Sequence, residues 1–168
     1  MANSLGYDVA DSLTTALNDA GYNDQTTHEV MIQSKDSAVL AKLKQQQTKY
    51  KLVYTLPQGI GSASATSLVA VKEFADAVVV ERNSVFALSN FFIIKQTDLV
   101  EELHSVGLAT YAQVFRNEFV SLPWDFTDGT AEINSYVQLA NIDGFITDSP
   151  KTVRTYKSKC TFCFHCFI

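Results

Sequence analysis

The stretch Asn141-Ile142-Asp143-Gly144-Phe145-Ile146-Thr147-Asp148-Ser149-Pro150 has the pattern of a short apolar strand that ends in Thr-Asp and is stopped by a proline. The residues just before it, 131–140, carry apolar side chains at helical spacing: Ile133, Tyr136, Val137 and Ala140. A helix, a tight turn, a buried strand and a polar strand end therefore follow one another. The same unit recurs earlier in the chain, so this last copy decides the fold.

Four earlier segments are predicted as strands, and helical patterns separate them. The strands are 30–33, 51–56, 77–81 and 110–115. The helices are 8–20, one that begins at Asp36 or Ser37, one that carries Leu68, Val71 and Ala75, and one capped by Thr97 or Asp98. Residues 84–96 are expected to be irregular, and 152–156 to start one more helical turn. Because a helix follows each strand, parallel pairing with right-handed crossovers is the economical solution, and the fold class is α/β.

The pattern leaves an open sheet and a barrel as alternatives. Gly59 and Gly61 precede a helix, but a third glycine is missing, which favours a spacer over a nucleotide-binding loop. Five βα units are too few to close an eight-stranded barrel. A barrel architecture would therefore make this chain a part of one.

Composition excludes several classes of protein. The 168 residues are 46% hydrophobic and 18% charged, which is typical of a soluble globular domain. The formal net charge of -5 argues against a nucleic-acid partner. No apolar run has the length of a transmembrane segment, and the first residues lack the pattern of a signal peptide. Taken alone, these features predict a cytosolic protein.

The three cysteines lie at the end of the chain, at Cys160, Cys163 and Cys166, with His165 between the last two. Their spacing suits a metal, but no second ligand pair exists to close a structural site. A short unstructured tail is the preferred interpretation. We therefore divide the chain into a domain, 1–156, and a Cys/aromatic tail, 157–168.

Polar side chains follow the predicted strands at their carboxyl ends, where parallel α/β folds place their working residues. These ends are Gln33-Ser34, Thr55, Glu81-Arg82, Arg116-Asn117-Glu118 and Thr147-Asp148. The two arginines predict that an anionic group such as a phosphate is held there. The alternative is that Glu81, Arg116 and Asp148 pair with one another.

Groups for acid–base chemistry are missing from these strand ends. His28 precedes its strand, His104 lies within a helix and His165 lies in the tail. No pair of carboxylates follows a strand at the spacing that would hold a divalent cation. We therefore predict neither a catalytic residue nor a metal ligand in this chain.

Four motifs resemble the plant glycerophosphodiester phosphodiesterase-like family, and specifically the C-terminal part of its phosphodiesterase domain. They are Val30-Met31-Ile32-Gln33-Ser34, Ala75-Asp76-Ala77-Val78-Val79-Val80, Gln113-Val114-Phe115-Arg116-Asn117-Glu118-Phe119 and Asp143-Gly144-Phe145-Ile146-Thr147-Asp148-Ser149-Pro150. The resemblance runs from about Gly6 to Cys160. It implies a TIM-type barrel of the phospholipase C-like phosphodiesterase kind, of which this chain supplies the last five βα units of eight.

The resemblance also implies an activity, the hydrolysis of glycerophosphodiesters to glycerol 3-phosphate and an alcohol. Family enzymes use a divalent cation, calcium or magnesium, which carboxylates hold, and a pair of histidines for acid–base chemistry. These residues belong to His-Arg-Gly and Glu-x-Asp motifs, and this sequence contains neither motif. This chain alone is therefore expected to be inactive. The candidate substrate-binding residues are the strand-end residues Ser34, Glu81, Arg116, Asn117 and Asp148. Arg116 and Asn117 follow a strand in a matched motif and are expected on the phosphate side of the pocket.

The chain departs from the family pattern at two places. Val114-Phe115-Arg116-Asn117 stands where many members have Trp-Thr-Val-Asn, and Ser34-Lys35 stands where they have Ser-Phe. The lost aromatic residues favour an alternative function, a non-catalytic domain that binds a cell-surface polyol or wall polymer. By family, the protein is expected outside the cell or at the plasma-membrane surface. Exposed sheet edges predict self-association.

Overall fold

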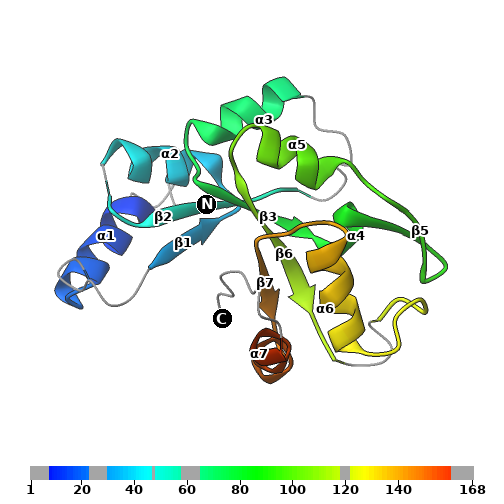
Figure 1. The fold of residues 1–168 in the computed structure, drawn as a ribbon. Helices are drawn as coiled ribbons and strands as arrows, with labels where there is room; N and C mark the ends of the chain where they lie inside the picture. The colour runs from blue at the N-terminus through cyan, green and yellow to red at the C-terminus, as the bar shows by residue number, and fades with distance from the viewer. Residues whose placement is uncertain (1–7, 23–29, 47, 58–64, 118–121, 160–168) are drawn as a thin grey trace.

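The computed structural model describes residues 8–22, 30–46, 48–57, 65–117 and 122–159. Five parallel strands form its main sheet in the order β1-β2-β3-β6-β7: β1 (Met31–Ser34), β2 (Lys51–Thr55), β3 (Ala77–Glu81), β6 (Ala109–Phe115) and β7 (Gly144–Thr147). The sheet is curled, and the helices lie around its outer side (Figure 1). The predicted α/β class and the five parallel strands are confirmed.

Helices connect the strands, and most begin where the sequence predicts. They are α1 (Val9–Asp19), α2 (Ser37–Gln45), α3 (Ala65–Lys72), α5 (Leu99–Ser105), α6 (Gly129–Gln138) and α7 (Pro150–Lys159). Asp36 caps α2, because its carboxylate accepts a hydrogen bond from the Ala38 amide. The last helix, α7, is longer than the single turn expected from residues 152–156.

The prediction of an irregular segment at 84–96 was wrong. A short helix, α4 (Arg82–Val85), leads into an antiparallel hairpin of β4 (Phe86–Ser89) and β5 (Phe92–Gln96). The hairpin forms a separate two-stranded sheet at the edge of the molecule (Figure 1). Its turn is Asn90-Phe91, which lacks the glycine that normally marks a two-residue hairpin turn in a sequence.

Apolar side chains pack on both faces of the main sheet. The central strand β3 is almost fully buried, with Ala77, Val78, Val79 and Val80 each at most 1% exposed, as a parallel strand covered on both faces requires. The outer core lies between the sheet and the helices and includes Leu40, Leu99, Leu103, Ile133 and Phe145. The opposite, inner face carries a smaller cluster of Val53, Ala77, Val79 and Tyr111.

Candidate functional site at the carboxyl ends of the strands

A layer of polar side chains continues the inner face beyond its apolar cluster. Side chains of a strand alternate between the two faces, so the positions two residues after Met31, Val53, Val79 and Tyr111 lie on the same face as that cluster. These positions are Gln33, Thr55, Glu81 and Gln113. They come from four neighbouring strands, at or next to the strands' carboxyl ends.

Hydrogen bonds join these four side chains, which we call the inner polar layer. The Gln33 amide donates to Thr55 Oγ1 at 2.8 Å and lies 3.5 Å from Gln113 Oε1. The Gln113 amide donates to Glu81 Oε1 at 2.9 Å. The layer thus offers one carboxylate and two amides whose positions are fixed by neighbouring groups. Such a set suits ligand hydroxyl groups, which donate to the carboxylate and accept from amides.

Arg82 does not belong to this layer, which corrects the expectation of two arginines at the strand ends. Its guanidinium forms an ion pair with Glu132 of α6 and lies over the Phe115 ring, 5.6 Å from the ring centroid. The Glu132 side chain is only 1% exposed. Burial raises the pKa of this carboxyl to about 7, although the Arg82 guanidinium acts in the opposite direction. The pair therefore anchors α6 to the sheet.

Arg116 and Asp148 pair with each other, as one of the two sequence interpretations predicted. Arg116 Nε donates to Asp148 Oδ2 at 2.8 Å, and both side chains are more than half exposed. The Glu81 carboxylate instead accepts a hydrogen bond from the Gln113 amide. The three-residue network is therefore only partly formed, and Arg116 remains at the solvent-facing rim of the sheet.

The other two predicted site residues have structural partners. Ser34 Oγ accepts a hydrogen bond from the Asp36 amide at 3.0 Å, just before α2. The Asn117 amide donates to Thr152 Oγ1 of α7 at 2.5 Å. Asn117 also lines an open pocket of about 320 Å³ with Leu122 and with Asp128, Gly129 and Thr130 at the start of α6. Their roles in binding stay predictions.

Among the described residues, the one histidine, His104, lies at the opposite end of the strands from the inner polar layer. His104 Nε2 lies 2.8 Å from Asp143 Oδ2, and Asp143 also accepts from the Thr110 amide, at the amino ends of β6 and β7. His28, His165, Glu118, the Gly59 loop and the three cysteines lie outside the described residues. Within the described ranges, no helix has both the length and the apolar character needed to cross a membrane.

Comparison with known proteins shows the family of the chain. The sequence model of the glycerophosphoryl diester phosphodiesterase family matches residues 3–152. The chain belongs to this family. It is 44% identical over 154 residues to glycerophosphodiester phosphodiesterase GDPDL1 of Arabidopsis thaliana and 42% identical over 153 residues to GDPDL3 of the same plant. Each match covers 90% of this chain and 20% of the relative, so the chain spans about a fifth of these proteins.

A solved structure confirms the fold expected for this family. The described chain matches a protein of Silicibacter pomeroyi DSS-3 that carries the provisional name glycerophosphoryl diester phosphodiesterase, with a TM-score of 0.60 and 14% sequence identity. The match covers 93% of this chain and 45% of that protein. The curled parallel sheet is thus part of a TIM-type barrel, and the inner polar layer lies at the carboxyl ends of its strands.

The family resemblance implies a divalent cation, and the residues that the structure describes do not form a site for it. Among the described residues, no three His, Cys, Asp or Glu side chains lie close enough together to hold a metal ion. Glu81 is bonded to an amide, and Asp148 to an arginine. We therefore assign no step of a hydrolytic reaction to a cation held by these residues.

The sequence interpretation placed Gln33 and Thr55 at polar strand ends but left them out of the substrate-binding set, and it missed Gln113 altogether. The signal was present in the two-residue period of the strands, because Glu81 shares its face with Val79 and Ala77. The same period places Ser34 on the face opposite to Gln33. The direction of Arg82 had no such signal, because it follows the strand and belongs to α4.

Proposed function

We propose that this chain forms the last five βα units of a glycerophosphodiester phosphodiesterase barrel and supplies one side of its substrate pocket. The observation that carries the proposal is the inner polar layer, which lies where TIM-type barrels bind their substrates. The reaction of the family breaks a phosphorus–oxygen bond with water and releases glycerol 3-phosphate and an alcohol.

The proposed roles follow from the chemistry of each side chain. The Glu81 carboxylate accepts hydrogen bonds from hydroxyl groups of the glycerol, and the Gln33 and Gln113 amides hold that carboxylate and its neighbours in place. Arg116, exposed at the rim, supplies positive charge on the phosphate side. Proton transfer and cation binding are assigned to the part of the barrel that this chain does not contain.

A split-barrel assay tests the proposal. The chain is assayed alone and after fusion to the first three βα units of the corresponding barrel of Arabidopsis GDPDL1. The readout is release of glycerol 3-phosphate from glycerophosphocholine. We expect no turnover from the chain alone and turnover from the fusion. In the fusion, Glu81→Gln should lower the activity at least about tenfold, because a charge-assisted hydrogen bond to the substrate is lost.

Two results would contradict the proposal. One is robust turnover by the chain alone, which would place the acid–base groups within it. The other is a folded fusion, verified by circular dichroism, that binds a wall polymer and hydrolyses nothing. That outcome would support the non-catalytic binding domain instead. Gln45→Lys, on the exposed face of α2, serves as a control that leaves the fusion active.

A further inference from the structure

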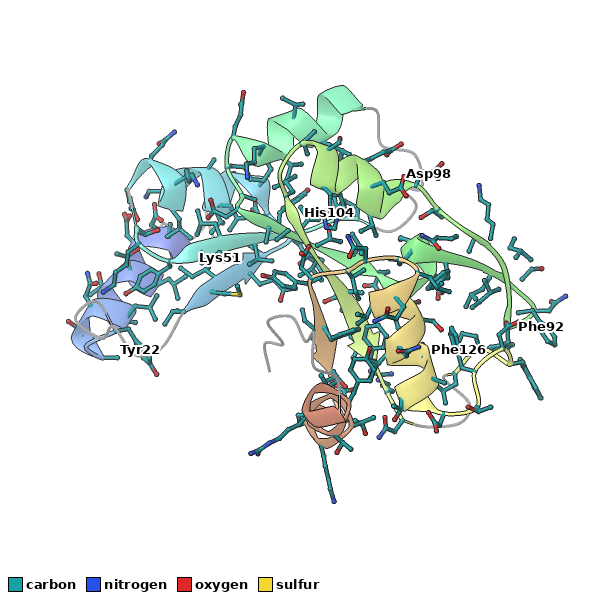
Figure 2. The ribbon with its side chains drawn as sticks, in the orientation of Figure 1. Tyr22, Lys51, Phe92, Asp98, His104 and Phe126 are labelled. Atoms are coloured by element: carbon teal, nitrogen blue, oxygen red, sulfur yellow. The ribbon has the colours of Figure 1, made fainter. Side chains whose placement is uncertain are left out.

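The β4–β5 hairpin exposes large apolar side chains to solvent. Phe92 is 53% exposed, and Ile94, on the same face of β5, is 64% exposed. The residue between them, Ile93, packs against the outer core instead. Phe91 at the turn is 59% exposed. Figure 2 shows Phe92 at the outer end of the hairpin.

The turn of the hairpin is strained at the same place. Both turn residues have positive φ angles, 49° at Asn90 and 64° at Phe91. A two-residue turn of this kind favours Asn-Gly, because a bulky side chain rarely adopts this backbone conformation. Phe91 therefore costs stability and makes its side chain available to solvent. A strained residue that serves no packing purpose suggests a functional contact.

A second segment completes the surface and fixes its shape. Trp124 is 64% exposed, and its ring lies nearly parallel to that of Phe92, with centroids 6.4 Å apart. The Trp124 amide donates to the Phe91 carbonyl at 2.9 Å, and the Ile93 amide donates to Asp125 Oδ2 at 2.7 Å. These bonds join the hairpin to the loop before α6. Phe91, Phe92, Ile94 and Trp124 thus form a preformed surface, which we call the aromatic tip.

We propose that the aromatic tip docks the protein on a lipid surface by entering the interfacial layer of a bilayer. The hairpin that carries most of the tip lies at the edge of the molecule (Figure 1). The tip combines aromatic rings with an aliphatic side chain, and its tryptophan is of the type that bilayer interfaces favour. A sugar-binding surface would need polar side chains aimed at hydroxyl groups, whereas the Asp125 carboxylate beside the tip is already bonded to the Ile93 amide.

Charge decides which lipid surface fits. The chain has a formal net charge of -5, so anionic lipids would repel it, and the tip itself contains no charged side chain. A zwitterionic phosphatidylcholine surface is therefore the expected partner. The choice of lipid agrees with the proposed function, because glycerophosphodiesters are phospholipids without their acyl chains. The docking test needs no substrate, so the two proposals fail independently.

The test uses the full chain and phosphatidylcholine vesicles. Trp124 is the chain's single tryptophan, so its fluorescence reports directly on the tip. We expect a blue shift of its emission on titration with vesicles, together with flotation of the protein. Phe92→Ser should weaken partitioning about tenfold, because this variant lacks the phenylalanine ring that the bilayer would bury. Phe91→Gly should weaken it similarly while leaving the stability unchanged or higher, because glycine suits the turn.

Val69→Ser provides the matched control, because Val69 on α3 is 53% exposed and lies outside the tip. This variant should bind vesicles as the unchanged chain does. The proposal is overturned if phosphatidylcholine vesicles produce neither shift nor flotation, or if Phe91→Gly and Phe92→Ser float as before. It is also overturned if the fluorescence shift follows protein concentration or soluble glycans without vesicles, which would assign the tip to a second copy or to a carbohydrate.

Discussion

At Glu132, burial and the neighbouring Arg82 guanidinium act in opposite directions, and burial is the larger effect. The pKa of this carboxyl is about 7 in the folded chain against an ordinary value of 4.5. A group whose pKa is raised by folding stabilises the fold below its unfolded pKa, and this contribution is lost as the pH rises through the folded pKa. As the pH rises from 5 to 8, ionisation of Glu132 should therefore lower the free energy of unfolding by up to ~3 kcal/mol.

Comparison with Glu132→Gln isolates this effect, because the amide keeps the shape of the side chain and cannot ionise. The difference in unfolding free energy between the two proteins, measured by urea titration at several pH values, should move in favour of the variant as the pH rises. A difference that is constant from pH 5 to pH 8 would show that the carboxyl does not titrate there.

Gly129 lies close to the end of the Asn117 side chain. A Cβ atom at this position would lie 2.8 Å from Asn117 Oδ1. Gly129→Ala should therefore destabilise the chain by about 1 kcal/mol, because the exposed Asn117 side chain must rotate and give up its hydrogen bond to Thr152 Oγ1. Combining it with Asn117→Ala removes the clashing atom, so thermal or urea unfolding should find the double variant less destabilised than the sum of the two single changes. Strict additivity would argue against the contact.

At the scale of the elements, two helices that both begin after an aspartate differ in their caps. Asp128 Oδ1 accepts from the Thr130 and Ala131 amides, each at 2.8 Å, at the start of α6. Asp98 stands at the same position of α5, where its side chain makes no capping bond. Asp128→Ala should therefore cost about 1 kcal/mol in urea unfolding, and Asp98→Ala much less. Equal losses would mean that the charge near the helix terminus, rather than the cap, matters.

The cap of α5 also shows how far sequence patterns extend. Both Thr97 and Asp98 were candidate caps from their residue types, but Thr97 Oγ1 instead donates to the Ser84 carbonyl at 2.6 Å, across the base of the hairpin. The sequence did not predict the hairpin, because the exposed apolar residues of β5 do not alternate regularly with polar ones and the hairpin turn has no glycine. Residues that serve a surface rather than the core depart from the patterns on which prediction rests.

For the whole molecule, alternation of helices and strands was sufficient to predict the parallel sheet, since each strand is a short apolar run that a helix separates from the next. The family motifs lie at the strands and their carboxyl ends, so the type of barrel followed from the resemblance. The partners of individual polar side chains did not follow. Whether Arg82 bonds Glu132 or a ligand depends on the packing of α6 against β6, which only the folded chain defines.

The partial barrel leaves two parallel strands with one neighbour each among the described strands, β1 and β7. Their unpaired backbone groups favour pairing with another chain, so sedimentation velocity should show a mass that rises with protein concentration. Gln33→Lys places a charge on edge strand β1 and should reduce this association. Gln45→Lys adds the same charge on the exposed surface of α2 and should leave it unchanged. A monomer at every concentration, or equal behaviour of the two lysine variants, would show that these edges do not drive association.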